Sequence, residues 1–293
     1  HIEPEQDITR IRFRTDGILH PQQPTSHRLA GALVSRLKLM AGLDISEKRL
    51  PQDGRFNITV RDQHIDIRLS TMPMQYGETA VMRLLNQTAG IPHLEDIGMD
   101  PSTLARFRKA IRSSHGIVLV TGPTGSGKTT TLYAALKDIN DPGKKIITIE
   151  DPVEYQIAGI TQVQVNPKID LDFARILRSL LRQDPDIALI GEMRDNETME
   201  IALRTAMTGH LVLSTLHTND AASTVSRLID MGAAPFMLAS SLRGILAQRL
   251  IRKICDNCAR LAVLSDTHKT LIATTLGAPA DTFAFKSSTG CPH

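Results

Sequence analysis

A glycine-rich segment, GPTGSGKT at residues 122–129, has the residue types and spacing of a phosphate-binding loop. It follows the apolar run 116–121 and leads into a helical pattern that ends near Ile139. Glycines allow successive backbone N–H groups to point at phosphate oxygens. Lys128 would then meet the β- and γ-phosphates, and the Thr129 hydroxyl would hold Mg²⁺. The residues predicted to bind a nucleoside triphosphate are Gly122, Pro123, Thr124, Gly125, Ser126, Gly127, Lys128, Thr129 and Thr130.

Carboxylates follow two further apolar runs. Glu192 comes shortly after residues 187–190, and Glu150 and Asp151 come directly after residues 146–149. Ligands of open parallel sheets bind at the carboxyl ends of the strands, so these side chains should meet the phosphate loop. In a P-loop fold the strand before Glu192 lies beside the loop, so we expect Glu192 to face the γ-phosphate and to hold Mg²⁺ through water. Another carboxylate is needed to orient or deprotonate the attacking water.

Two histidines flank a third apolar run. His210 precedes residues 211–215, and His217 follows them. A histidine near a strand is more often a structural hydrogen-bonding residue than a catalytic one. His217 is the better candidate for sensing the γ-phosphate, because it stands at the same end of its strand as the carboxylates do.

Composition limits the function classes. The chain has 293 residues, which is enough for two domains, and 41% of them are hydrophobic, which supports real cores. Net charge is only +3, and aromatic residues make up 3% with no Trp, so we expect no nucleic-acid partner. No apolar window approaches a membrane span, and three cysteines without an export signal indicate a reducing compartment, so the chain is predicted to be cytoplasmic. The start at His1 without a Met indicates a fragment.

The first ninety residues favour a small α+β unit. Ile11 and Phe13 alternate with arginines as in a half-buried strand, and apolar residues recur at helical spacing from Ser26 to Met40. Alternation at 56–60 and again at 65–69 predicts a hairpin, and Val81 to Leu85 are predicted to form one more strand.

Beyond this unit, apolar runs alternate with helical patterns, which is typical of βαβ units around a parallel sheet. The predicted organisation is an α/β protein with an N-terminal α+β domain at 1–92, a linker at 93–102, a P-loop NTPase domain at 103–254 and a C-terminal region at 255–293. The predicted core strands are 117–121, 146–149, 187–190 and 211–215, and the predicted helices are 128–139, 172–183, 195–208 and 220–231.

The order of these motifs resembles the secretion-type ATPases that power type II secretion and type IV pilus assembly. The resemblance spans essentially the whole chain. In the C-terminal half it rests on GPTGSGKT, on ITIEDPVEY at 147–155, on LRQDPDIALIGEMRD at 181–195 and on TGHLVLSTLHT at 208–218. In the N-terminal half it rests on IRFRTDG at 11–17, KRLPQDGR at 48–55 and GETAVMRLL at 77–85.

The resemblance implies a RecA-like ATPase domain behind a PAS-like N-terminal domain. It also implies roles for several residues: Glu150 and Asp151 would form the aspartate box, Glu192 would be the Walker B glutamate, and His210 and His217 would form the histidine box.

Arginines are implicated by the same resemblance. Members of the family close the nucleotide site with arginines of the N-terminal domain, and Arg68 and Arg83 fall in the matching strands. Arg178 and Arg182 match arginines on the helix before the Walker B strand. Guanidinium groups can neutralise charge on the γ-phosphoryl oxygens. The alternatives are solvated strand-edge arginines and, for Arg178 and Arg182, pairing with local carboxylates.

Partners are also implied by the resemblance. The family forms homohexameric rings that work on an inner-membrane platform protein and use an N-terminal docking partner. The chain would then be cytoplasmic, peripheral to the inner membrane, and in contact with the membrane only through partners.

The C-terminal region carries Cys255, Cys258 and Cys291, which resemble part of a zinc module of the family. Structural zinc needs four ligands, and the chain ends one residue before a fourth Cys would stand. His268 or His293 could complete the site, or zinc could bind only in the full-length protein. A redox role for the cysteines is less favoured. Retraction motors usually lack this module, so its presence favours the assembly and secretion branch.

Three functions remain open from the sequence. The first is an ATP-hydrolysing motor for pilus assembly or type II secretion. The second is a RecA-like helicase or DNA translocase, which DNA-stimulated ATPase activity would select. The third is a nucleotide-binding regulatory subunit without turnover, which tight ATP binding without hydrolysis would select.

Overall fold

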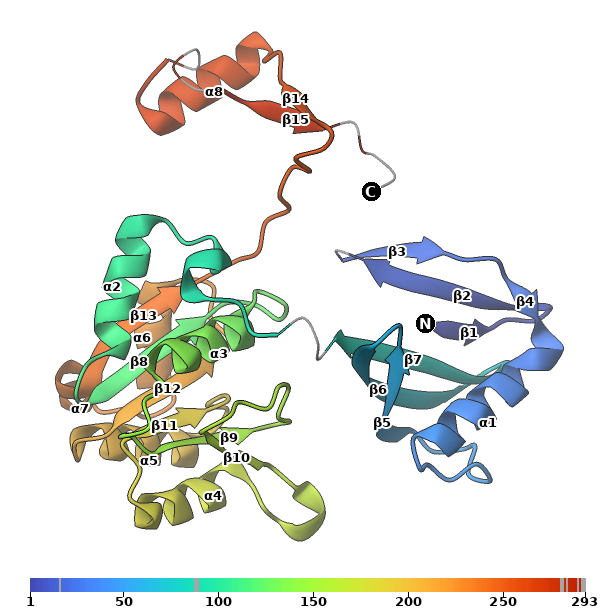
Figure 1. The fold of residues 1–293 in the computed structure, drawn as a ribbon, viewed down its shortest axis with the longest axis horizontal. Helices are drawn as coiled ribbons and strands as arrows, with labels where there is room; N and C mark the ends of the chain where they lie inside the picture. Colours follow the sequence, from blue (N-terminus) through green and yellow to red (C-terminus); the bar gives the residue numbers. More distant parts are fainter. Residues whose placement is uncertain (16, 87–89, 280–281, 283, 289, 291–293) are drawn as a thin grey trace. The chain divides into compact units, whose positions relative to one another are not determined.

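The computed structural model describes residues 1–15, 17–86, 90–279, 282, 284–288 and 290. The N-terminal domain is built around an antiparallel sheet with strand order β3-β2-β1-β7-β6-β5, and β4 pairs with β2. A single α-helix, α1, lies along this sheet (Figure 1). The elements are β1 (Ile2–Pro4), β2 (Ile8–Thr15), β3 (Ile18–Pro21), β4 (Thr25–Ser26), α1 (Ala30–Met40), β5 (Gln52–Val60), β6 (Gln63–Met74) and β7 (Gly77–Asn86).

The alternation of apolar and polar residues decides which face of this sheet α1 covers. Val34 of α1 packs with Ile2, Leu69 and Ala80 in a small apolar core. Successive side chains of a strand point to opposite faces, so Arg68, which precedes the buried Leu69, points away from α1. The predicted hairpin is confirmed as β5 and β6, and the predicted strand after Val81 lies within β7.

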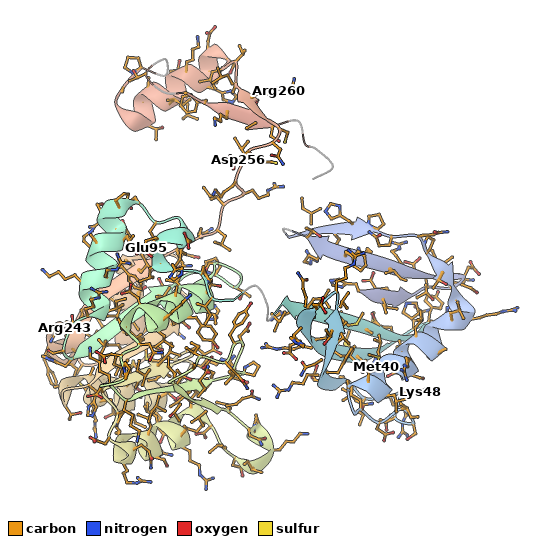
Figure 2. The ribbon with its side chains drawn as sticks, viewed as in Figure 1. Met40, Lys48, Glu95, Arg243, Asp256 and Arg260 are labelled. Atoms are coloured by element: carbon orange, nitrogen blue, oxygen red, sulfur yellow. The ribbon has the colours of Figure 1, made fainter. Side chains whose placement is uncertain are left out.

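The segment predicted as a linker contains ordered structure. It holds the 3-10 turn η2 (Leu94–Ile97) and the start of α2 (Pro101–Ile111), whose N-cap is Asp100. Leu94 is buried in the core of the following domain. Glu95, marked in Figure 2, forms an ion pair with Arg108 of α2. The segment is therefore attached to the second domain by both packing and charge.

The second domain has a parallel six-stranded sheet of order β10-β9-β11-β12-β8-β13. Strand β12 lies between β8, which leads into the phosphate loop, and β11, the strand that precedes Glu192. A parallel strand cannot return by a tight turn, so sequence order does not determine sheet order. The strands are β8 (Gly116–Thr121), β9 (Ile146–Glu150), β10 (Thr161–Gln164), β11 (Ile187–Ile190), β12 (Leu211–Leu216) and β13 (Leu242–Ala247).

Helices cover both faces of this sheet (Figure 1). In β8, Ile117 and Leu119 join a core that includes α4, α5 and α7, while Val118 and Val120 join a core that includes α2 and α3. Burial on both faces explains why the strands are continuous apolar runs. The predicted α/β class, with a small α+β domain first, is confirmed. The helices are α3 (Lys128–Ile139), α4 (Phe173–Leu180), α5 (Asn196–Met207), α6 (Ala221–Asp230) and α7 (Pro235–Ser241).

Residues 250–293 form a separate compact unit that follows Arg249. It pairs β14 (Ala259–Leu261) with β15 (Lys286–Ser288) in antiparallel fashion, and α8 (Asp266–Leu276) lies between them in sequence. Across the described part of the chain, no helix combines the length and apolar character needed to cross a membrane.

Candidate functional site

The glycine-rich loop connects β8 to α3, as the sequence predicts. Its first residue, Gly122, has a φ of +147°, and a Cβ there would lie 2.4 Å from the Gln248 carbonyl oxygen and 2.5 Å from Ser126 Oγ. Gly127, at φ +86°, is the N-cap of α3 and brings no capping side chain. A positive φ and a lack of space for a Cβ are tolerated without strain only by glycine. Because no side chain caps α3, its first N–H groups are available to a ligand.

Lys128 is the buried cation of this loop. Its Nζ donates to the carbonyl oxygens of Gly122 at 2.8 Å and of Pro123 at 3.1 Å. Burial lowers the pKa of Lys128, and the negative charge of Glu192 acts in the opposite direction. An anionic phosphate would oppose the burial effect in the same way.

Two observations fit a phosphate-bearing ligand. The buried Ser126 Oγ has no hydrogen-bond partner among the described residues. The N-terminus of α3 supplies backbone donors together with a favourable dipole for an anion. Thr129 and Glu192 border the same pocket and offer oxygen ligands of the kind Mg²⁺ prefers.

A pocket of about 350 Å³ collects the predicted groups. Loop residues 124–130 form one wall, and side chains from the carboxyl ends of β9, β11 and β12 form another. The predicted candidates that border it, besides the loop, are Arg83, Glu150, Asp151, Glu192 and His217.

Glu192 is held by charged neighbours at the carboxyl edge of the sheet. One of its oxygens forms an ion pair with Arg194, and the other lies 3.6 Å from His217 Nε2. Glu192 in turn raises the pKa of the Arg194 guanidinium. The Glu192 carboxylate thus borders the pocket between Arg194 and His217.

Glu150 is in a different environment from Glu192. It is buried, and its carboxylate accepts hydrogen bonds from the Tyr133 hydroxyl, from Thr148 Oγ1 at 2.5 Å and from Gln162 Nε2 at 3.1 Å. Burial raises the pKa of Tyr133, and the hydrogen bond to Glu150 raises it further by a smaller amount. Three donors already occupy Glu150, whereas its neighbour Asp151 is exposed at the rim of the pocket.

Arg68 and Arg83 lie directly opposite each other on neighbouring strands β6 and β7. Residues in such a pair share one face of the sheet, and like charges there repel unless an anion is near. Arg83 lines the pocket, and Arg68 Nη1 lies 3.3 Å from Glu154 Oε1. Both arginines are therefore on the sheet face away from α1.

Several predicted residues do not line the pocket: Gly122, Pro123, Arg68, Arg178, Arg182 and His210. Arg178 forms an exposed ion pair with Glu197, which is the local pairing that the sequence left open, and Arg182 donates to the Arg178 carbonyl oxygen at 3.2 Å. His210 bonds the Thr205 carbonyl oxygen at the amino end of β12. A six-residue strand separates its two ends by about 20 Å, so His210 is far from His217.

The cysteine region is described only in part. Cys255 and Cys258 are of intermediate exposure, while the predicted ligands Cys291 and His293 lie outside the described residues. His268 lies in the first turn of α8, where its backbone N–H bonds the capping Ser265. Within the described ranges, no group of three or more His, Cys, Asp or Glu side chains gathers around a metal position. Zinc binding stays a prediction.

Sequence reasoning missed several residues around the pocket. Arg194 stands two positions after Glu192 in GEMRD, a spacing that could have suggested the pair. Tyr133 and Gln248 are not close in sequence to the groups they bond, so no local pattern marks them. Glu154 lies within EDPVEY, but its pairing with Arg68 joins residues 86 positions apart.

Comparison with known proteins gives consistent results. A family model described as "Type II/IV secretion system protein" matches residues 1–293. The chain is 58% identical over 258 residues to the type II secretion system protein HxcR of Pseudomonas aeruginosa, covering 88% of this chain and 55% of that protein. It is 52% identical over 258 residues to the type IV pilus assembly ATPase PilB of Thermus thermophilus, covering 88% and 29% respectively.

A solved structure is similar as well. The crystal structure of the pilus retraction motor PilT with bound ADP has a TM-score of 0.65 and 33% identity, covering 85% of this chain and 74% of that one. The chain spans about half the length of HxcR and less of PilB.

Proposed function

Because this chain belongs to the type II/IV secretion system protein family, we propose that it hydrolyses ATP as a motor in type II protein secretion or type IV pilus assembly. The observation that carries the proposal is one pocket that joins the glycine-rich loop to Glu192. The names of HxcR and PilB support the two pathways, and the ADP bound to PilT supports a nucleotide as ligand. These relatives favour the motor over the DNA translocase.

The residues divide the chemistry among themselves. The loop N–H groups and Lys128 would bind the phosphates, and Thr129 and Glu192, which line the same pocket, would hold Mg²⁺. The metal supplies charge neutralisation on the phosphate oxygens when it is bound. Glu192 or Asp151 orients the attacking water, with His217 beside Glu192. Glu150, which is occupied by three donors, orients the segment that carries Asp151.

Arg68 and Arg83 are proposed to act on the nucleotide, within one chain or across a subunit boundary. Substituting either with Ala should lower kcat by roughly tenfold to a thousandfold, because charge stabilisation that develops with the transition state is lost. Steady-state ATPase measurements on both variants test this.

Arg55 provides a matched control for these variants. It lies opposite Arg68 on β5, so it shares their sheet face, but it does not line the nucleotide pocket. Arg55→Ala should retain kcat. Full ATPase activity in both Arg68→Ala and Arg83→Ala would show that the two arginines are solvated strand residues with no role in hydrolysis.

We further propose a homohexameric ring that works from the cytoplasmic side of the inner membrane, through a platform protein and an N-terminal docking partner. Arg178, exposed on α4, Arg182, exposed just after the end of α4, and His210 then remain candidates for contacts to a neighbouring subunit. The domain boundaries given in the sequence analysis, and zinc binding in the full-length protein, are proposed on the same basis.

The proposed function predicts ATPase activity that depends on assembly. Specific activity should be low at low concentration and rise as subunits meet, because each site would be completed by a neighbour. The test is ATPase activity over a wide concentration range, with the mass measured by light scattering. Flat specific activity from a monomer would contradict the ring, activity that only DNA elicits would select the translocase, and ATP binding without any turnover would select a regulatory subunit.

A further inference from the structure

The edge strand β13, which carries Arg243 (Figure 2), ends beside the start of the phosphate loop. It runs parallel to β8, and Ala247 is the register partner of Thr121. Gln248 and Gly122, which follow Ala247 and Thr121 in the chain, therefore lie side by side. The Gln248 N–H donates to the Thr121 carbonyl oxygen at 2.9 Å, and the Gln248 carbonyl oxygen occupies the space beside Gly122.

The side chain of Gln248 also reaches the loop. Its Nε2 donates to the Ser126 carbonyl oxygen at 2.6 Å, and its Oε1 accepts from Thr131 Oγ1 at 2.9 Å. The carbonyl can only accept, so the amide nitrogen must face Ser126 and the amide oxygen must face the Thr131 hydroxyl. Thr131 is buried on α3, and its hydroxyl anchors the amide oxygen in this orientation.

The bond to Ser126 determines the direction of a neighbouring donor. The Ser126 C=O and the Gly127 N–H belong to one peptide group, and in a trans peptide these two bonds point in opposite directions. Gly127 lines the pocket, and glycine offers little resistance to rotation of the peptide before it. Holding the carbonyl away from the pocket therefore keeps the Gly127 N–H directed towards it.

We propose that Gln248 is a positioning residue for phosphate binding: its amide, anchored by Thr131, holds the Ser126–Gly127 peptide so that the Gly127 N–H faces the nucleotide phosphates. The proposal rests on the proposed function for the identity of the ligand. Gln248 belongs to none of the sequence motifs and is 122 residues from Ser126. Because the loop N–H groups cradle phosphates that ADP and ATP share, both nucleotides should depend on Gln248 alike.

The test measures ADP and ATP affinity by titration calorimetry on the full chain. Gln248→Met keeps the length of the side chain and removes both hydrogen bonds, and the affinity for each nucleotide should fall by about 5- to 30-fold. Thr131→Val removes only the bond that anchors the amide oxygen, so the fall in nucleotide affinity should be smaller, about two- to fivefold. Combining the two changes should add little to Gln248→Met alone, since both act on one linkage.

Thermal melting without nucleotide separates positioning from general damage. The melting temperature of Gln248→Met should remain close to that of the unchanged protein while its ADP affinity falls. Gln183→Leu, at an exposed glutamine outside the pocket, should leave the affinity unaltered. Unchanged ADP affinity in Gln248→Met overturns the proposal, and if that variant does not fold, unchanged affinity in Thr131→Val overturns it instead.

The same measurements distinguish this proposal from the proposed function. If the unchanged protein binds ADP and ATP but never hydrolyses ATP, the motor is refuted while the comparison of Gln248 variants still decides the positioning role. If it binds neither nucleotide, both proposals fail.

Discussion

Glu192→Gln should bind ATP about as tightly as the unchanged protein and hydrolyse it about 10²- to 10⁴-fold more slowly, the range that a positioned general base or acid contributes. Glutamine keeps the size of the side chain but loses the charge that would hold Mg²⁺ and the attacking water. The substitution also removes the ionic partner of Arg194 and of His217 when it is protonated. ATP affinity is measured by calorimetry, and turnover by phosphate release.

A control for this variant is available on α5. Glu200 forms an exposed ion pair with Arg204, four residues further along the helix, so Glu200→Gln removes the same charge away from the pocket. It should retain full turnover. Hydrolysis at the wild-type rate in Glu192→Gln would rule out its assignment and shift attention to Asp151, the exposed carboxylate at the pocket rim.

Lys128→Ala should lower ATP affinity by about a hundredfold or more, because it removes a buried cation that would interact with two phosphates. In the structure the ammonium group bridges the carbonyl oxygens of Gly122 and Pro123, so its loss also leaves these acceptors without that donor. Calorimetry with ATP and ADP measures the effect, and circular dichroism checks that the chain remains folded.

Lys109→Ala is the corresponding control, since Lys109 is exposed on α2 and does not border the pocket. Its ATP affinity should match that of the unchanged protein. Near-normal ATP affinity in Lys128→Ala would place the nucleotide somewhere other than the glycine-rich loop. The two substitutions thus test different steps: Lys128→Ala tests binding, and Glu192→Gln tests hydrolysis after binding.

Much of the fold follows from local patterns in the sequence. The apolar runs at 117–121 and 187–190 and the helical pattern at 128–139 correspond to β8, β11 and α3 to within one residue. Strands buried on both faces must be continuously apolar, and a glycine turn before a helix is recognisable by its spacing. Short elements such as β1 and α7 escaped prediction, because three to seven residues show too little periodicity.

The candidate site was only partly predictable. The loop, Glu192 and His217 could be identified because each comes soon after the end of an apolar strand. Parallel strands bring their carboxyl ends to one edge of the sheet. His210 belongs to the same sequence motif as His217, but it lies at the other end of β12 and therefore does not reach the pocket. The separate environments of Glu150 and Glu192 were not predictable, because they depend on Tyr133, Gln162 and other residues distant in sequence.

The α/β class and the position of the phosphate loop follow from local sequence patterns, since both depend on residues close together in the chain. The tertiary structure decided that β12 separates β8 from β11, that Arg68 lies opposite Arg83, and that Gln248 holds the loop peptide. Each of these is a pairing between distant segments. Such pairings form only when the strands and helices of the whole domain pack together. No local pattern of residues encodes them.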